Sequence, residues 1–156
     1  MGLPPRVVSV LKYGEMIILD AEALGEGGIG EDYAKHIAPA LRRRGLTPAE
    51  VGEEFGPDDD SYRVISQGRT YLIFAPETDT SGFESWGNAT FAIFDIVNRQ
   101  LEGLPYRFYA FDNGNGLYGM FMTKEIYAEF VGSMKRKIEW PYIPEPEPPW
   151  YGQAHD

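Results

Sequence analysis

The residues best suited to chemistry in this sequence are acidic, and six of them lie within eleven positions that contain no Lys or Arg. They are Glu50, Glu53, Glu54, Asp58, Asp59 and Asp60. Carboxylates at this density attract cations or a basic protein surface. The consecutive aspartates lack the alternation of a calcium-binding loop, so the sequence predicts no metal site here. We interpret the run as a candidate surface for a basic partner, with a solvated loop as the alternative.

A second polar segment, Asp112–Gly116, lies between two stretches rich in aromatic residues. Its Asn, Asp and Gly residues tolerate positive φ, so the sequence predicts a hairpin turn. Aromatic side chains on both flanking strands cannot all face one core, so some are expected to contact a partner, with core packing as the alternative. The candidate contacts in this region are Tyr109, Asp112, Asn113, Asn115 and Tyr118.

Groups suited to catalysis are scarce. The chain has no cysteine, which excludes disulfides, thiolate metal sites, iron–sulfur clusters and a cysteine nucleophile. Of its two histidines, His36 falls in a predicted helix and His155 is the penultimate residue, so neither indicates a catalytic triad. The sequence therefore predicts no catalytic residue, no cofactor and a protein that is not an enzyme.

The glycine-rich segment Gly25–Gly30 matches the pattern G-x-G-x-x-G of dinucleotide-binding proteins. Glu26, Glu31 and Asp32 would repel a phosphate at this point, and the rest of the chain does not predict repeated βαβ units. We interpret this segment as a loop without a nucleotide.

The overall charge narrows the range of partners. Twenty-four acidic residues against 14 Lys and Arg give a net charge of −10, which disfavours nucleic acid and anionic membranes. No apolar run approaches the length of a membrane span, and the first residues lack the features of a secretory signal. We expect a cytoplasmic protein.

Hydrophobic periodicity and turn residues indicate the elements that position these groups. The expected elements are helices over 31–44, 47–55, 85–103 and 123–138, and β-hairpins over 62–75 and 106–122. Residues 6–19 fit a hairpin or a helix. The fold class predicted is α+β, with both hairpins in one antiparallel sheet and the helices packed on one face.

The end of the chain has a different composition. Residues 140–156 include five prolines and several aromatic residues, which predict an extended segment. Exposed aromatic rings are unfavourable in water, so we expect this tail to dock on a single domain formed by residues 1–139.

Four segments together resemble the small immunity proteins of bacterial polymorphic-toxin systems. They are Ser85–Thr90, Tyr106–Ala110, Asn113–Thr123 and Trp140–Pro144. The resemblance implies a single α+β domain that binds a co-produced toxin domain and blocks its active site or substrate entry. It implies no catalytic residue.

The expected function is therefore neutralisation of a toxin that has a basic cleft. A net charge of −10 would accelerate association with such a cleft. Two alternatives remain open. One is a small-molecule-binding protein or enzyme with a pocket between sheet and helix, and the other is an acidic inhibitor of a nucleic-acid enzyme.

Overall fold

The structure is a computed structural model that describes residues 16–76, 83–112, 117–133 and 140–145. Its strands are β1 (Met16–Leu19), β2 (Gly52–Phe55), β3 (Tyr62–Ser66), β4 (Arg69–Phe74), β5 (Tyr106–Asp112) and β6 (Leu117–Thr123). Its helical elements are α2 (Ala21–Ala23), η2 (Leu24–Gly28), α3 (Ile29–Asp32), η3 (Tyr33–Ile37), α4 (Ala38–Arg43), η4 (Pro57–Asp59), α5 (Phe83–Gln100) and α6 (Lys124–Gly132). The predicted α+β class is confirmed.

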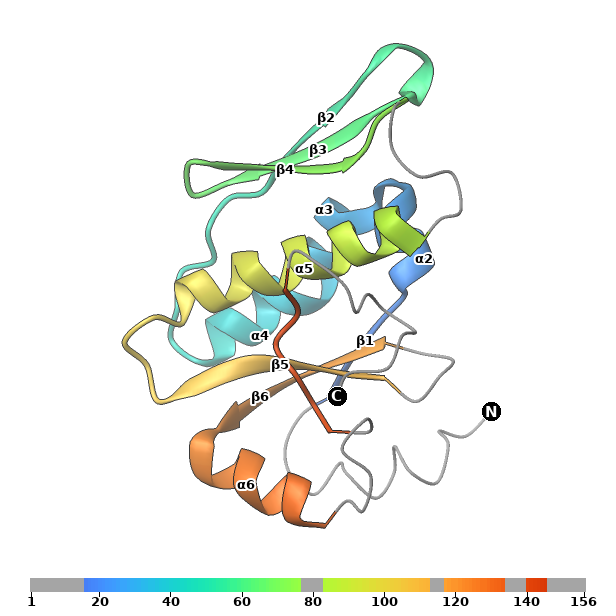
Figure 1. The fold of residues 1–156 in the computed structure, drawn as a ribbon. Coiled ribbons are helices and arrows are strands. Elements are labelled where there is room, and N and C mark those ends of the chain that lie inside the picture. Colours follow the sequence, from blue (N-terminus) through green and yellow to red (C-terminus); the bar gives the residue numbers. More distant parts are fainter. Residues whose placement is uncertain (1–15, 77–82, 113–116, 134–139, 146–156) are drawn as a thin grey trace.

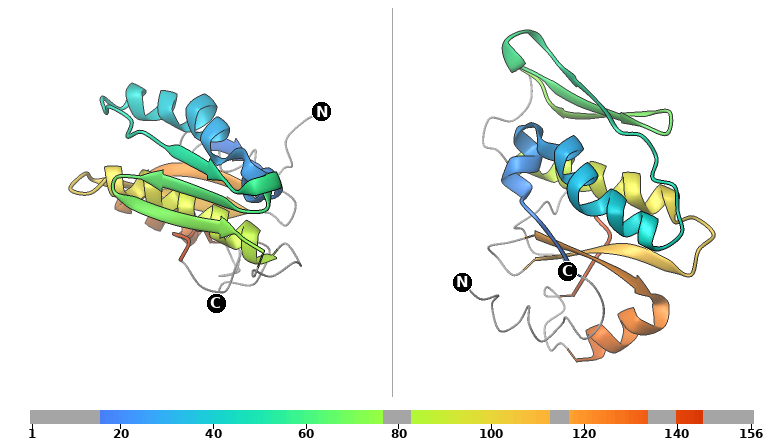
Figure 2. Two further views of the ribbon diagram at one scale, coloured as in Figure 1. Left: turned by 90° about the horizontal axis from the view of Figure 1, so that it is seen from above. Right: turned by 180° about the vertical axis from the view of Figure 1, so that it is seen from behind.

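The elements form four layers (Figure 1). A sheet of order β2-β3-β4 lies at one end, and the run from α2 to α4 lies beside α5 in a helical layer beneath it. The second sheet, of order β1-β6-β5, follows, and α6 covers its far side (Figure 2). All pairings in both sheets are antiparallel.

The expectation of one sheet with helices on one face is wrong. The two predicted hairpins form, but they belong to different sheets, and each gains a third strand from elsewhere in the chain. Helix α5 explains this arrangement, because side chains on several of its faces are buried. These include Ala89, Ala92, Ile93, Phe94, Ile96 and Val97. A helix buried this widely needs apolar cover on two sides, and the two sheets provide it.

Strand β6 is the centre of the second sheet, and its residues from Leu117 to Met122 are all buried. Leu117 and Phe121 belong to the core that α5 shares, whereas Tyr118, Met120 and Met122 pack with Phe130 of α6. Because successive side chains of a strand point to opposite faces, a continuous apolar strand requires cover on both. This requirement places α6 opposite α5.

The segment expected to form a helix over 47–55 is instead extended and ends in β2. Thr47 and Pro48 resemble a helix start, but Gly52–Phe55 pairs with β3 along its whole length. The Phe55 ring stacks on Tyr62, with ring centroids 4.7 Å apart. Pairing with the next strand of the chain here outweighs a local capping signal.

The glycine-rich segment, expected to be a loop, instead has helical structure on both sides of a break at Gly27. Gly27, with φ of 121°, introduces a kink in η2, and helical structure resumes at Ile29. Two of the glycines permit close packing. A Cβ on Gly25 would lie 2.7 Å from the Trp86 ring, and a Cβ on Gly30 would overlap the Glu53 carboxylate. The segment is glycine-rich because the helix is packed tightly against its neighbours.

Of residues 6–19, expected to form a hairpin or a helix, only 16–19 are described, and they form β1, a strand that pairs with β6. The helices expected over 31–44, 85–103 and 123–138 agree with their predictions where they are described. Helix α5 covers most of the range expected for it, and the helix expected from Lys124 onwards is α6. Thr123 caps α6, because its Oγ1 accepts a hydrogen bond of 3.2 Å from the Ile126 N–H. The predicted end of this helix, at residues 134–138, lies outside the described residues.

The described part of the C-terminal segment is docked, as predicted. The Ala110 N–H donates to the Tyr142 carbonyl at 2.7 Å, and the Tyr142 N–H donates to the Ala110 carbonyl at 2.9 Å. The Tyr127 hydroxyl donates to the Pro141 carbonyl at 3.0 Å. Residues 146–156 of the predicted tail lie outside the described part of the chain.

Among the residues that the structure describes, no helix combines the length and apolar character needed to cross a membrane.

Candidate interaction surface beside strand β2

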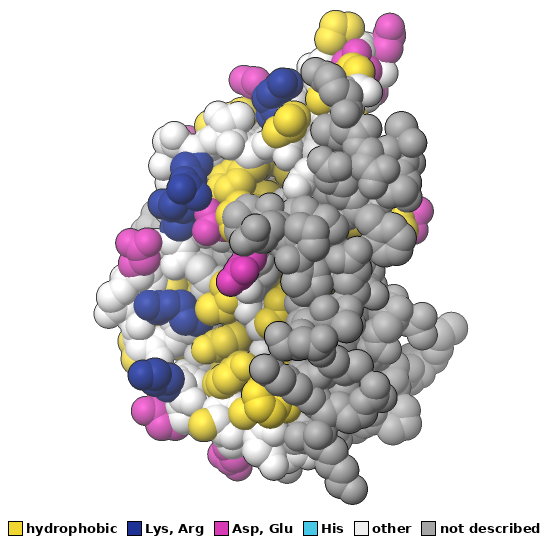
Figure 3. Space-filling model, in the orientation of Figure 1, with side chains coloured by type: hydrophobic (Ala, Val, Ile, Leu, Met, Phe, Trp, Pro, Cys, Tyr) yellow, Lys and Arg dark blue, Asp and Glu magenta, His cyan; other side chains and the backbone are white. Residues whose placement is uncertain are grey.

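The predicted acidic residues lie along the outer strand of the first sheet and on the turn that follows it. Strand β2 pairs only with β3 in its sheet, so its other edge is not paired to a strand of that sheet. Glu50, Glu54, Asp58, Asp59 and Asp60 are all exposed, and we call these five residues the acidic edge. Figure 3 shows acidic side chains at the tip of this sheet, on the face that it displays. The structure thus brings these acids together on one surface.

The β2–β3 turn holds its aspartates on a defined backbone. The Gly56 N–H donates to the Ser61 carbonyl at 3.1 Å, and the Asp59 N–H donates to the Gly56 carbonyl at 3.0 Å. Asp58 and Asp59 both have φ of 55°, in the left-handed region that costs most residues about 1 kcal/mol or more. Asp tolerates this conformation better than most residues because its short side chain bonds locally. The turn therefore presents three adjacent carboxylates to solvent.

Glu53 has a different role from the other predicted acids. Its Oε2 accepts a hydrogen bond of 2.5 Å from the Tyr62 hydroxyl and one of 3.2 Å from the Gly30 N–H. The Tyr62 hydroxyl also accepts from the Ile29 N–H at 3.2 Å. Burial, followed by the bond to Glu53, raises the pKa of Tyr62 well above its usual range. Glu53 therefore ties β2 and β3 to the start of α3, and its carboxylate is engaged within the fold.

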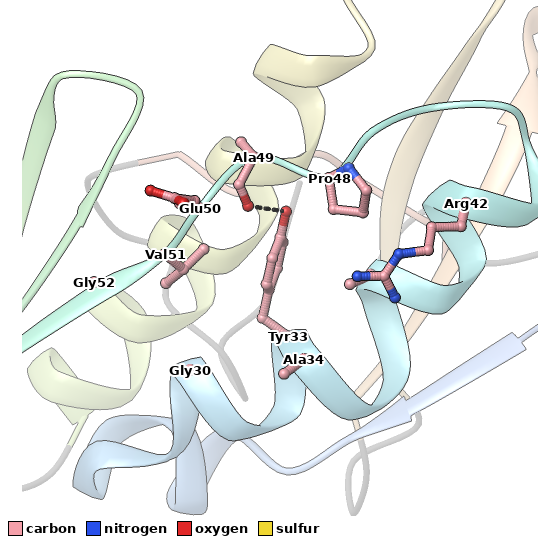
Figure 4. Close-up of a pocket in the computed structure, with 10 residues that line it drawn as sticks. Gly30, Tyr33, Ala34, Arg42, Pro48, Ala49, Glu50, Val51 and Gly52 are labelled. Carbon is pink, nitrogen blue, oxygen red and sulfur yellow. Dashed lines mark hydrogen bonds between the residues drawn. The ribbon is translucent and has the colours of Figure 1, made fainter.

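A groove adjoins the acidic edge at Glu50 (Figure 4). It encloses about 450 Å³ between the helical run from α3 to α4 and the segment that leads into β2. The helical wall is lined by Gly30, Tyr33, Ala34, Ala38 and Arg42, and the opposite wall by Pro48, Ala49, Glu50, Val51 and Gly52. Most of these side chains are small or apolar, but the exposed lining is almost equally polar and apolar, and a charged residue lies near each end.

Hydrogen bonds fix the walls of this groove. The Tyr33 hydroxyl donates to the Ala49 carbonyl at 2.9 Å and accepts from Gln100 Nε2 at 3.0 Å. Gln100 Oε1 accepts from the Ala49 N–H at 2.8 Å, and the Ser66 hydroxyl donates to the Glu50 carbonyl at 2.8 Å. Burial raises the pKa of Tyr33, so its hydroxyl stays protonated and keeps its bond to Ala49. The groove is therefore preformed.

The sequence did not single out this groove. The helix expected over 47–55 would include Pro48 and would not form the extended wall of this groove. The available signal was the spacing of Ala34, Ala38 and Arg42, which places two small residues and one cation in a line along a helix. Such spacing is common, and only the extended path of residues 48–52 turns it into a groove.

The second predicted contact region is only partly described. Tyr109 is half-buried and stacks on Tyr127 of α6, with ring centroids 4.5 Å apart. Tyr118 is 6% exposed and packs beside Phe111, so it is a core residue in this structure. Asp112 ends β5, and its side chain lies outside the described residues, as do Asn113 and Asn115. Strands β5 and β6, which flank residues 113–116, belong to the other sheet, with the helical layer between that sheet and the β2-β3-β4 sheet (Figure 1).

Other polar clusters in the described residues are structural. Asp95 Oδ2 accepts hydrogen bonds from the Tyr71 hydroxyl, Arg69 and Arg99, which join β4 to α5. The described part of the chain contains no group of three or more His, Asp or Glu side chains arranged to hold a metal ion. His36 lines a shallow groove beside β1 together with Lys35 and Arg43.

The chain was compared with protein-family models, with curated proteins and with solved structures, and none of them matched.

Proposed function

We propose that this chain is an inhibitory binding protein of the immunity type, which neutralises a toxin domain by placing the acidic edge in its basic cleft. The observation that carries the proposal is the β2–β3 turn, where Asp58, Asp59 and Asp60 are exposed on a hydrogen-bonded backbone. The resemblance to immunity proteins, read from other segments of the sequence, supports the same function.

Charge supports a partner with a basic surface. Residues 45–62 contain no Lys or Arg, and the first cation after them, Arg63, lies opposite Glu54 in the β2–β3 pair. Acidic groups at such a surface accelerate encounter with a basic cleft, and bound carboxylates occupy positions that an anionic substrate would need. Inhibition would then follow from occupancy alone, without a catalytic group on this chain.

The partner is identified by capture with the tagged full-length chain from its native host, followed by mass spectrometry. Inhibition is then measured by adding the purified chain to the purified partner. We expect the partner's activity to disappear at a molar ratio near one. A partner that stays active under saturating binding, or turnover of a small molecule by this chain alone, would contradict the proposal. If the captured partner acts on nucleic acid but is not a toxin, the result favours the alternative function, an acidic inhibitor of a nucleic-acid enzyme.

The contact surface is tested with the triple variant Asp58→Asn, Asp59→Asn and Asp60→Asn. We expect association at low salt to slow roughly tenfold and to lose salt dependence, with little change in dissociation. The matched control is Glu102→Gln, Glu125→Gln and Glu129→Gln, which removes the same charge from exposed positions far along the chain. If both variants slow association equally, the effect comes from net charge, and the acidic edge is not part of the interface.

A further inference from the structure

Strand β2 is an edge of its sheet, and we call its side away from β3 the open edge of β2. We propose that an extended segment of the partner protein, rich in Lys and Arg, adds to the open edge as a further strand of this sheet. This inference rests on the proposed function, because it names the part of the partner that the acidic edge recognises. The backbone of β2 determines the place, and the charges of β2 determine the occupant.

The register of β2 and β3 identifies the backbone groups that face outward. Residues of an antiparallel pair alternate between positions that exchange hydrogen bonds with the neighbouring strand and positions that point away from it. The Gly56 N–H donates to the Ser61 carbonyl at 3.1 Å, so this pair is a bonded one. Phe55 directly precedes Gly56, and Glu53 lies two residues further back, so both occupy the alternate positions. Their N–H and carbonyl groups therefore point to the open edge.

The β3–β4 hairpin gives the same assignment independently. Its turn consists of residues 67–68, and Ser66 and Arg69, which flank this two-residue turn, form a bonded pair. Alternation along β3 then directs the backbone of Ile65 towards β2, where its partner is Gly52. Gly52 is thus a bonded position, which again leaves the next residue of β2 facing outward.

The described residues leave the open edge uncovered. All of β2 is exposed, and within the described part of the chain no hydrogen bond reaches the backbone of Glu53 or Phe55 from outside the sheet. In the view from behind in Figure 2, the sheet stands above the helical layer, and no described helix or strand lies at its level beside β2. Each outward residue offers one donor and one acceptor, and such groups at a sheet edge are a template for pairing with another chain.

The charges of β2 disfavour a second copy of this chain at the open edge. Two copies of β2 in antiparallel register would bring Glu53 and Glu54 of one chain beside the same residues of the other. Like charges that face each other across strands are destabilising. Asp58, Asp59 and Asp60 follow shortly after the strand and would add to the repulsion. The acidic residues therefore protect this edge from self-association, which is a common role of charged residues on edge strands.

The same charges favour a strand that carries Lys or Arg. Glu53 points to the helical layer, where its carboxylate accepts from the Gly30 N–H, so the next residue, Glu54, lies on the outer face of the sheet. Arg63 lies opposite Glu54 on β3, and a cation on an added strand would flank it on the other side. On the helix-facing side, Phe55 is 47% exposed and would contact an apolar residue of the added strand. The expected segment thus alternates Lys or Arg with apolar residues.

Strand β4 is the other edge of this sheet and serves as an internal comparison. By the same alternation, its outward positions are Thr70 and Leu72. Its sequence contains no acidic residue, and Arg69 at its start bonds to Asp95 of α5. A basic segment therefore has no electrostatic preference for β4.

The first test uses the full chain with the capped peptide Ac-KVKVKV-NH2 and, as a control, Ac-EVEVEV-NH2. The basic peptide should bind at low salt with a dissociation constant on the order of 0.1–1 mM, and the acidic peptide should not bind. Amide hydrogen exchange is followed by nuclear magnetic resonance. In the free chain, Glu53 and Phe55 should exchange faster than Glu54. Basic peptide at ten times its dissociation constant should slow exchange at Glu53 and Phe55 about tenfold and leave Thr70 and Leu72 unchanged.

N-methylation of the basic peptide separates strand addition from simple charge attraction. Only every second N–H of an added strand faces β2, whereas methylation changes no charge. Methyl groups on one alternating set of residues, the lysines or the valines, should therefore abolish binding, and methyl groups on the other set should weaken it less than about threefold. Equal effects of the two sets, whether both peptides bind or neither does, would overturn the proposal.

Glu54→Gln is the test variant of the chain, and Glu125→Gln, at an exposed position of α6, is its matched control. Glu54→Gln should weaken the basic peptide about two- to fivefold, because it removes one cross-strand charge pair, whereas Glu125→Gln should leave binding unchanged. Equal weakening by both variants would overturn the proposal. Protection of β4 in place of β2 would also overturn it. Protection of β2 that rises with protein concentration in the absence of peptide would assign the open edge to a second copy and overturn it as well.

The captured partner separates this inference from the proposed function. In the complex, Glu53 and Phe55 should be protected from exchange. If they are not, while the triple substitution at Asp58, Asp59 and Asp60 still slows association, strand addition is overturned and the acidic edge stands. If they are protected but the partner stays active under saturating binding, the proposed inhibition is overturned and strand addition stands.

Discussion

The Tyr62 hydroxyl of β3 donates a hydrogen bond of 2.5 Å to Glu53 of β2 while it accepts one from the backbone of Ile29. Two neighbouring strands are thereby bonded to the start of a helix more than twenty residues earlier in the chain. The Glu53 carboxylate also accepts from the Gly30 N–H, where the start of a helix favours a negative charge. One side chain of the acidic run thus stabilises the fold, although it is exposed like its neighbours.

Replacing Glu53 should therefore destabilise the protein. Glu53→Ala leaves the Gly30 N–H and the Tyr62 hydroxyl without their acceptor, and we expect the free energy of unfolding to fall by about 1–3 kcal/mol. Urea denaturation measures the change. Glu54→Ala, next in sequence and exposed, is the control and should change stability by less than about 0.5 kcal/mol. Equal effects of the two substitutions would contradict a structural role for Glu53.

Stability should fall at alkaline pH because of Tyr71. Burial and the hydrogen bond to Asp95 raise the pKa of Tyr71 from 10.0 to about 12. Between these values the unfolded chain releases the phenolic proton while the folded chain retains it, so the free energy of unfolding falls as pH rises. We expect Tyr71→Phe to be less stable at neutral pH but to show a shallower decrease over this range. Urea midpoints at stepped pH test this, and parallel pH profiles for the two proteins would refute it.

Gly119 should tolerate no side chain. A Cβ at this position would overlap the Phe108 ring. This ring is also held in place by stacking on Phe94, with ring centroids 4.7 Å apart. Gly119→Ala should therefore cost about 1–3 kcal/mol or more of stability, because a packed core relaxes poorly around an added methyl group. Gly52→Ala in β2 is the matched control, since the nearest atom to its Cβ would be 3.8 Å away. A similar thermal midpoint for both variants would show that Phe108 moves aside freely.

The docked C-terminal segment should contribute to stability. A chain ending at Glu139 loses the two backbone bonds between Tyr142 and Ala110 and the acceptor of the Tyr127 hydroxyl. We expect a lower thermal midpoint than for the full chain. A chain ending at Glu145 keeps these contacts and serves as the comparison. If both truncated chains unfold at the same temperature, the contacts of residues 140–145 are not stabilising.

The candidate surface was partly predictable. A run of acids without cations predicts an exposed charged surface wherever the chain places it, and Glu50, Glu54, Asp58, Asp59 and Asp60 are all exposed. Glu53 was not distinguishable from them, because its partners Tyr62 and Gly30 come from separate elements. The groove was not predictable either, since residues 48–52, which form its extended wall, were expected to be helical.

The sequence by itself determined the long helix α5, the start of α6 at Thr123 and both hairpins, because periodicity, capping and turn residues act between neighbours in the chain. Only the tertiary structure decided that the hairpins lie in separate sheets, that β1 and β2 extend them, and that helical structure surrounds a kink at Gly27. Strand pairing and glycine contacts join residues far apart in sequence. Which strands pair and which glycines are in close contact depends on the arrangement that buries α5 and β6 on both sides. No local sequence pattern specifies this arrangement.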